Sequence, residues 1–406
     1  MADSVTKLGD LSFYYDKKLS NINLSKGLKN IGKLGLHFTL IEEIEIPEGI
    51  TEIKKDTFSK CGKLKKVVLP KSLEKIANNA FNDCVSLANI EIHESNKNFK
   101  FKAGILMNAD ESEMLIILPS AINGDTFVVP DKVVKLNSNQ LEIYPQIKNI
   151  TIPKSVTEIA PEFINKNITK VNITENEKYE TYKNGIYEKV NGIREKIIRY
   201  YGTEEVVEIE KGIKIIGSDC FNNKNITNIT LPESLEEIGA NAFAYTKLES
   251  LNLSENIQKL DPRFLYWSNI TKLIIDDNNL NYAVENDILY NKNKTELILP
   301  IKPVGTITEF EIPYGVTKIG KMAFYNQHKM TKIIIPETVK EIGKDTFGYC
   351  KGLTKIEIPS SVDKIGENCF DTCTNLNEIR INKEKESIAG SPWGADKGDR
   401  VVIWLK

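Results

Sequence analysis

The sequence predicts an α/β repeat solenoid: a right-handed coil with a long parallel β-sheet on one face, and short strands and single helical turns opposite. The main evidence is a recurring phrase, for example IEIPEGITEIKKDTFSKC at 44–61 and IIIPETVKEIGKDTFGYC at 333–350. A unit of this size cannot bury its apolar face alone, so neighbouring units must stack into one continuous core. Three longer repeats add β-hairpin excursions to the coil.

Each repeat, or rung, begins with a strand of alternating apolar residues. Successive strand side chains point to opposite faces, so Val67 and Leu69 point inward while Lys66 and Val68 point outward. Eleven of the fourteen steps between rungs are 21 to 23 residues long. The first inward residues of the fifteen expected strands are Ile22, Ile44, Val67, Ile90, Phe127, Ile150, Val171, Val207, Ile229, Leu251, Leu273, Phe310, Ile333, Ile356 and Ile379.

The rest of each rung follows from the same phrase. The Pro after the strand has no N–H to donate, so it ends the strand. A Val-x-x-Ile pattern, such as Val339 and Ile342, then predicts a second short strand, and x-x-x-Phe predicts a single helical turn. The repeat phenylalanines should form an internal ladder: Phe38, Phe58, Phe81, Phe163, Phe221, Phe243, Phe264, Phe324, Phe347 and Phe370.

The six cysteines keep to fixed places in the repeat. A cysteine tied to one repeat position is expected to be a small buried hydrophobe. The CxxxC at 369–373 is not accompanied by a second Cys or His pair at the spacing of a zinc site. We therefore expect neither a disulfide framework nor a metal site. Four cysteines lie three residues after the repeat Phe and two directly precede it: Cys61, Cys84, Cys350 and Cys373, then Cys220 and Cys369.

Three steps are 36 or 37 residues long, and their extra segments share one plan. In each, two β-rich runs flank a polar turn, which is typical of a β-hairpin. Since the insertions occupy the same phase of the repeat, we expect them to leave the solenoid on the same flank. The expected organisation is a lead-in at 1–20, a continuous solenoid at 21–382 with insertions at about 93–126, 174–206 and 276–309, and a cap at 383–406.

Composition and motifs exclude several function classes. The net charge of −2 gives no general attraction to nucleic acid or an anionic membrane, and no stretch of eighteen apolar residues predicts membrane insertion. The start of the chain lacks the apolar region of a secretory signal, so the protein is cytosolic or its start has been trimmed. The three histidines, His37, His93 and His328, lie in distant rungs, and no metal, phosphate or dinucleotide motif occurs. We expect no enzyme activity, cofactor or metal.

Binding is therefore expected on surfaces that the repeat leaves free. Alternating Lys and Glu columns on the outward sheet face are typical of a solvated surface, which stays the simpler interpretation. Exposed apolar residues within the columns, and tyrosines on the second insertion, are the alternative, because both can form protein interfaces. The candidate binding residues are Lys66, Val68, Lys170, Asn172, Lys272, Ile274, Lys332, Ile334, Lys355, Glu357, Tyr182, Tyr187 and Tyr201.

The joined pattern I-P-x-x-V-x-x-I-G-x-x-x-F-x-x-C resembles the BspA-type leucine-rich repeats of bacterial cell-surface proteins, over about residues 20–382. Leu64, Val67 and Leu69 also fit the L-x-x-L-x-L signature of a leucine-rich-repeat horseshoe. The resemblance implies a secreted or surface-attached, non-catalytic adhesion scaffold whose partner is a host matrix or cell-surface protein. The alternative is a module that binds glycans or cell-wall polymers within a larger surface protein. We expect a monomer.

Overall fold

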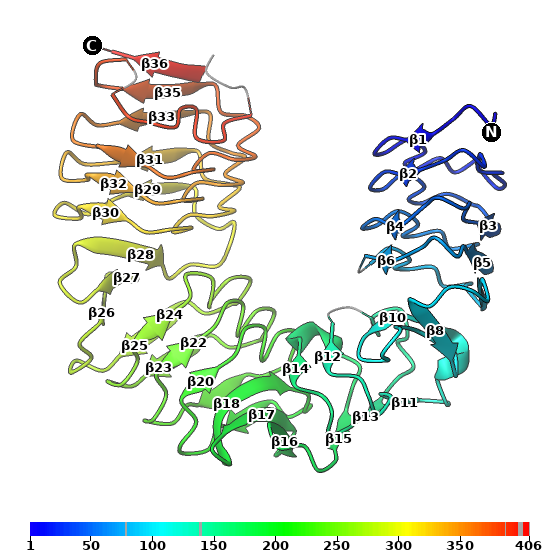
Figure 1. The fold of residues 1–406 in the computed structure, drawn as a ribbon. Coiled ribbons are helices and arrows are strands. Elements are labelled where there is room, and N and C mark those ends of the chain that lie inside the picture. The colour runs from blue at the N-terminus through cyan, green and yellow to red at the C-terminus, as the bar shows by residue number, and fades with distance from the viewer. Residues whose placement is uncertain (78, 138–139, 386, 397–400, 406) are drawn as a thin grey trace. The chain divides into compact units, whose positions relative to one another are not determined.

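The computed structural model describes residues 1–77, 79–137, 140–385, 387–396 and 401–405. Two compact units divide the chain, unit 1 at 1–186 and unit 2 at 187–406. Within each unit the chain winds through stacked rungs (Figure 1), which confirms the predicted solenoid. No helix among the described residues is long and apolar enough to cross a membrane.

Regular rungs of unit 1 contribute one strand to a first ladder and a two-residue strand to a second ladder. Both ladders are parallel. The first contains β3 (Glu43–Glu45), β5 (Lys66–Leu69), β7 (Asn89–Ile92), β11 (Thr126–Val128), β13 (Asn149–Ile152) and β15 (Lys170–Ile173). The second contains β1 (Lys7–Leu8), β2 (Asn30–Ile31), β4 (Glu52–Ile53), β6 (Lys75–Ile76), β12 (Lys135–Leu136) and β14 (Glu158–Ile159).

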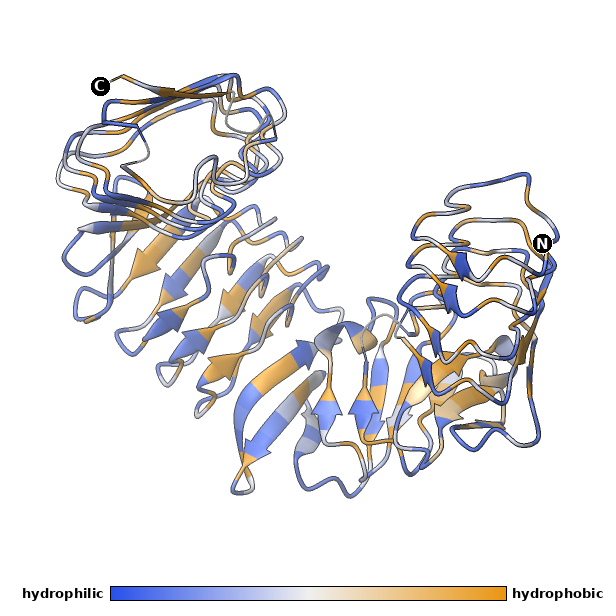
Figure 2. Cartoon of the chain, turned by 45° about the horizontal axis from the view of Figure 1, so that its top comes forward, coloured by the Kyte–Doolittle hydropathy of each residue, from blue (hydrophilic) through white to orange (hydrophobic). Residues whose placement is uncertain are grey.

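Unit 2 repeats this plan, and its strands alternate hydrophilic and hydrophobic residues along their length (Figure 2). The first ladder contains β19 (Val206–Glu208), β21 (Asn228–Thr230), β23 (Ser250–Leu253), β25 (Lys272–Ile275), β29 (Glu309–Glu311), β31 (Lys332–Ile334), β33 (Lys355–Ile358), β35 (Glu378–Ile381) and β36 (Val402–Trp404). The second contains β20 (Ile215–Ile216), β22 (Glu237–Ile238), β24 (Lys259–Leu260), β30 (Lys318–Ile319), β32 (Glu341–Ile342) and β34 (Lys364–Ile365).

The predicted register is confirmed wherever adjacent strands pair. Ile44, Val67 and Ile90 lie opposite one another, as do Ile356 and Ile379. The prediction of a strand at Ile22 is wrong. That segment has no ladder partner, and the Asn23 carbonyl accepts a hydrogen bond from the amino-terminal nitrogen at 2.7 Å.

Each insertion contains three strands, one more than the predicted hairpin. In the second and third insertions the third strand joins the second ladder, because β18 pairs in parallel with β20 and β28 pairs with β30. In the first insertion only Glu113, the residue before β10, bridges to Lys135. The boundary between the two units falls within β17. The first insertion contains β8 (Phe99–Lys102), β9 (Ile105–Asn108), β10 (Met114–Ile117) and the 3-10 helix η1 (Pro119–Ala121). The second contains β16 (Tyr179–Tyr182), β17 (Gly185–Val190) and β18 (Ile193–Tyr200). The third contains β26 (Tyr282–Glu285), β27 (Ile288–Asn291) and β28 (Glu296–Pro300).

The segment after each second strand, here called the Phe loop, is mostly turn where we expect a helical turn. Its residues include two at positive φ, four positions apart, such as Asp56 (58°) and Lys60 (60°). Left-handed residues interrupt a right-handed helix, so helix does not propagate. One Phe loop does contain a short 3-10 helix, η2 (Pro161–Phe163).

The phenylalanine ladder is confirmed with one exception. Every other predicted member is at most 7% exposed, and Phe324, Phe347 and Phe370 stack at 5.7 and 5.8 Å between ring centroids. Phe38 is not in the ladder. Leu36, which is fully buried, takes that place, because the second rung reaches it five residues after Ile31.

The cysteines are all buried, as the repeat spacing predicts, and all six are free thiols in this structure. Burial raises the pKa of the Cys84 and Cys350 thiols well above the ordinary value. At the position three residues after the ladder residue, the thiol also donates a hydrogen bond to the carbonyl of the ladder residue one rung earlier. The four bonds run from Cys61 to Leu36, Cys84 to Phe58, Cys350 to Phe324 and Cys373 to Phe347, at 3.1, 3.1, 3.2 and 3.0 Å.

The C-terminal tail adds a further rung. Trp393 is buried edge-on against Phe370, and β36 pairs with β35. The expected cap at 383–406 also includes residues 386, 397–400 and 406, which lie outside the described residues.

Candidate functional site

Among the described residues, the outward sheet face carries the predicted Lys column and exposed apolar residues, but these form no continuous apolar patch. Ile274 lies opposite Asn252 and Ile334 lies opposite Glu311, so each is isolated among polar neighbours. The exposed members of the predicted surface are Lys170, Asn172, Lys272, Ile274, Lys332, Ile334, Lys355 and Glu357, whereas Lys66 and Val68 are half-buried.

Lys66 and Val68 line a groove of about 1020 Å³ on the sheet face of unit 1. Its opposite wall is the irregular segment at 20–24. The ammonium of Lys66 is paired with Glu91 at 2.8 Å, which raises the pKa of Lys66 and lowers that of Glu91. The Lys66 ammonium in the groove therefore already has a partner.

The three tyrosines predicted on the second insertion do not share one surface. Tyr182 is exposed, but Tyr187 and Tyr201 are only 3% and 6% exposed. Tyr187 packs in the core of unit 2 with Ile197 and Ile216. These two side chains point inward because the strands of the insertion continue the solenoid wall, so they cannot contribute to an exposed binding face.

A cluster of exposed and half-buried aromatic side chains in unit 2 was not predicted. It comprises Tyr245, Tyr266, Trp267, Tyr325 and Tyr349, here called the aromatic row. Neighbouring rings lie 5.2 to 5.9 Å apart, each in contact with the next. Tyr245, Trp267 and Tyr349 are 53%, 39% and 36% exposed.

Three members of the aromatic row adopt a backbone conformation that their residue types disfavour. Tyr245, Trp267 and Tyr349 have φ values of 55°, 58° and 61°. The left-handed region costs an ordinary residue about 1–2 kcal/mol and is more easily adopted by Asn or Asp. Asp83 and Asn223 occupy the corresponding place, seven residues after the end of the second short strand, in other loops. The sequence signal was an aromatic residue at that place.

Four Phe loops carry the row, and the third insertion separates the loop that holds Tyr266 from the loop that holds Tyr325. The hydroxyl of Tyr266 accepts a hydrogen bond from the Asn326 side-chain amide at 3.1 Å, although the residues are 60 positions apart. A small hollow of about 40 Å³ lies between Tyr266 and Tyr325. Burial raises the pKa of Tyr266 to about 12, and burial likewise raises the pKa of Tyr325. Both phenols are therefore neutral donors at physiological pH.

A buried asparagine anchors each insertion in the same way. Asn96, Asn176 and Asn279 each donate through the side-chain amide to three carbonyls of the preceding rung, at 2.7 to 3.4 Å. Their side-chain oxygens accept from the backbone N–H groups two or three residues later. We call this arrangement the Asn clamp.

The aromatic residue three positions after the Asn clamp differs among the insertions. The Tyr282 hydroxyl accepts from the Leu260 N–H at 3.0 Å and lies 3.3 Å from the Gln258 carbonyl. The Tyr179 hydroxyl donates to the Thr157 carbonyl at 3.0 Å. The first insertion has Phe99 at this position, which provides no hydroxyl.

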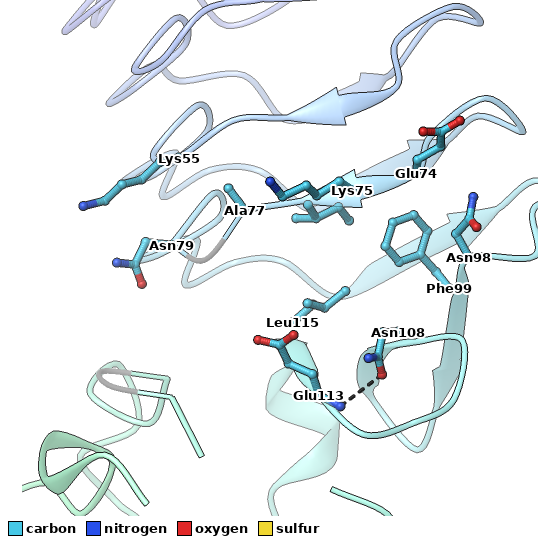
Figure 3. A pocket seen from close by; sticks show the side chains of 11 residues that line it. Lys55, Glu74, Lys75, Ala77, Asn79, Asn98, Phe99, Asn108, Glu113 and Leu115 are labelled. Carbon is cyan, nitrogen blue, oxygen red and sulfur yellow. Dashed lines mark hydrogen bonds between the residues drawn. The ribbon is translucent and has the colours of Figure 1, made fainter. Parts of the chain in front are cut away.

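A hollow of about 640 Å³ lies beside Phe99, between β6 and the first insertion (Figure 3). Figure 3 shows the Phe99 ring directed into it, with Glu74 and Lys75 on one side and Leu115 on the other. Its polar lining is formed by Lys55, Glu74, Lys75, Asn79, Asn98, Asn108 and Glu113. Among the described residues, no group of three His, Cys, Asp or Glu side chains could hold a metal ion.

Comparison with known families explains the repeat. The family model "BspA type Leucine rich repeat region" matches residues 1–103, 120–194, 191–308 and 302–392. The chain belongs to the BspA-type leucine-rich repeat family. No curated protein matches this BspA-type chain.

Several solved structures are similar to this BspA-type chain. A leucine-rich repeat protein from Eubacterium ventriosum is 21% identical, with a TM-score of 0.42 over 69% of this chain and 66% of that one. A leucine rich cell surface protein from Faecalibacterium prausnitzii is 17% identical, with a TM-score of 0.41 over 90% and 88%. The pneumococcal vaccine antigen PcpA is 15% identical, with a TM-score of 0.40 over 76% and 92%.

The BspA-type phrase accounts for the buried Ile, Phe and Cys residues and for the strand-ending Pro. It does not account for the aromatic row or for the hollow beside Phe99, which lie at residues where the rungs differ from one another. These two features are the candidate sites.

Proposed function

We propose that the chain is a non-catalytic binding scaffold that holds a protein ligand on the aromatic row. The observation that carries the proposal is the placement of Tyr245, Trp267 and Tyr349, which are exposed and left-handed where Asp83 and Asn223 stand in other loops. Strain at such positions persists where the surrounding structure over-determines it, and it is concentrated at functional sites. Tyr and Trp are also enriched among the residues that dominate protein interfaces.

The family supports a location at the bacterial cell surface and a host matrix or cell-surface protein as the ligand. The predicted Lys and Glu columns then serve as the solvated surface around the row. An ion pair within the columns supports this role, because Lys355 pairs with Glu357 at 3.0 Å while both side chains stay largely exposed. Such pairs contribute about 0–1 kcal/mol each and keep the surface polar.

Replacing the row tests the proposal. A variant carrying Tyr245→Asn, Trp267→Asn and Tyr349→Asn keeps a residue type that tolerates positive φ, so the fold is expected to be retained. The purified chain and the variant are both applied to a printed panel of extracellular-matrix proteins. We expect any protein captured by the wild type to bind at least about tenfold more weakly to the variant, since loss of interface aromatics commonly costs more than 1 kcal/mol each.

Tyr314→Asn is the matched control. Tyr314 is 87% exposed in the same unit but makes no contact in the row, so its loss should leave binding unchanged. Full binding by the triple variant, or equal losses from Tyr314→Asn, would contradict the assignment. Failure of the wild type to capture any protein on the panel would contradict a protein ligand.

A further inference from the structure

We propose that the hollow beside Phe99 is a saccharide-binding site whose first recognised group is a sugar hydroxyl. The site lies within unit 1, and every residue that lines it belongs to residues 55–115. It is separate from the aromatic row and does not depend on the function proposed for that row.

The first step concerns the open edge of β6. On one side the N–H groups of Lys75 and Ala77 donate to the carbonyls of Thr51 and Ile53, at 3.1 and 2.8 Å. Main-chain groups of successive strand residues point to opposite sides, so those of Ile76 point the other way. Among the described residues β6 has no strand partner on that side, because the β4–β6 ladder ends there. The Ile76 main chain therefore borders the hollow.

The second step is the internal precedent. In the third insertion, the place equivalent to this edge is occupied by a hydroxyl group, which accepts from the Leu260 N–H and lies within reach of the Gln258 carbonyl. Leu260 and Gln258 correspond to Ile76 and Glu74, because the Asn clamps of the two insertions bind equivalent carbonyls. The third insertion thus shows that a hydroxyl can bind this N–H and this carbonyl together. In the first insertion Phe99 has no hydroxyl to bind the equivalent groups.

The third step is the chemistry around that place. Glu74 and Glu113 supply acceptors, Lys55 an ammonium donor, and Asn79 an amide that both donates and accepts, while the Asn108 amide is already bonded to Ser112 and Glu113. A polyhydroxylated ligand needs this mixture, because every hydroxyl both donates and accepts. The hollow of about 640 Å³ lies in the size range of small-molecule sites.

An added peptide strand fits less well. The Phe99 ring faces the β6 edge. The backbone just before Phe99 is held by the Asn96 clamp, because the Asn98 N–H donates to the Asn96 side-chain oxygen at 2.8 Å. A strand would have to displace that ring, whereas a hydroxyl needs only the position beyond its outer edge. The geometry therefore favours a saccharide over an extended peptide.

Phe99→Tyr is the decisive variant. It supplies from within the chain the hydroxyl that the ligand would otherwise provide, as Tyr282 does in the third insertion. The wild type and the variant are tested against a printed array of mammalian glycans and against a soluble disaccharide of N-acetylglucosamine and N-acetylmuramic acid. The two arms distinguish host glycans from wall polymers. We expect the wild type to bind in one arm, with amide NMR shifts at Ile76 and Ala77, and Phe99→Tyr to lose that binding.

Two further variants keep the outcome interpretable. Phe101→Tyr adds the same hydroxyl on the same strand outside the hollow, so it should bind as the wild type does. Asn79→Gly keeps the left-handed backbone at φ 65° and removes one amide, and should weaken binding several-fold. A random-peptide pool is added to the wild type as a third probe. The proposal is overturned if neither saccharide arm shows binding, if Phe99→Tyr binds as well as the wild type, or if only the peptide pool shifts the Ile76 amide signal.

Discussion

The first and third insertions are built alike and end differently. Both begin with an Asn clamp, both contain three strands, and both place an aromatic ring against the last short strand of the preceding rung. In the third insertion the Tyr282 hydroxyl closes the strand edge. In the first insertion Phe99 cannot, and a hollow of about 640 Å³ lies there.

The difference teaches which parts of an insertion hold the fold and which are free to vary. The Asn clamp replaces the ladder that the insertion interrupts, because its amide binds carbonyls near the point where the ladder ends. A buried carbonyl left without a partner costs about 1–3 kcal/mol, so each insertion needs the clamp. One hydroxyl is less costly to omit when the groups that it would bind can reach solvent or a ligand.

The largest expected effect is loss of the clamp. Asn279→Ala removes donors to three carbonyls and an acceptor for two N–H groups at a fully buried position. We expect unfolding free energy to fall by about 3–5 kcal/mol, and Asn96→Ala to cost nearly as much. Urea denaturation of both variants measures the losses.

Asn256→Ala is the control for the clamp. Its amide also donates to a carbonyl of the preceding rung, at 2.9 Å, but the bond is exposed. We expect a loss below about 1 kcal/mol. Equal losses from Asn256→Ala and Asn279→Ala would show that the clamp has no special role, and a large loss from only one clamp would show that the two insertions are anchored differently.

The second insertion extends the comparison with a buried charge. The loop that follows it places Lys224, 6% exposed, at the position that Cys or Thr holds in regular rungs. Burial, together with the nearby positive charge of Arg199, lowers the pKa of Lys224 to about 8, against an ordinary value of about 10.4. The folded state therefore binds fewer protons than the unfolded state between these two values.

Lys224→Met, which keeps the volume and removes the charge, should raise stability by about 3 kcal/mol at pH 7. Because the unfolded chain holds the proton more tightly, wild-type stability should rise relative to the variant as the pH increases from about 8 to 10.4. Below pH 8 the difference should be constant. Denaturation of both proteins across this range measures the gap, and a gap that widens with pH would contradict the lowered pKa.

Much of this architecture could be predicted from the sequence, since each rung repeats one pattern of inward side chains. The register of Ile44, Val67 and Ile90 follows directly from that period. The repeat pattern gives no information at positions where the rungs differ. The third strand of each insertion and the aromatic row were therefore not predicted. Phe38 was misassigned for a related reason: its rung buries Leu36 in the ladder, and hydrophobicity alone does not distinguish the two. The partners of Asn96 lie 23 to 26 residues away, at distances that only the fold defines.

The smallest expected effect tests the comparison most directly, through the hydroxyl itself. Tyr282→Phe should lower stability by about 1–2 kcal/mol, because the Leu260 N–H and the Gln258 carbonyl lose their partner. Phe99→Tyr should raise stability by about 0.5–1.5 kcal/mol, the net worth of a typical hydrogen bond. Hydrogen exchange at the Leu260 amide should accelerate in the first variant, and at the Ile76 amide should slow in the second.

These opposite signs follow only if the two insertions are interchangeable at this position. A Phe99→Tyr variant with unchanged exchange at Ile76 would mean that the new hydroxyl does not reach β6, and that the hollow has a different origin from the missing bond. Together, the two variants test whether the tyrosine hydroxyl alone accounts for the closed strand edge in the third insertion and the open site in the first.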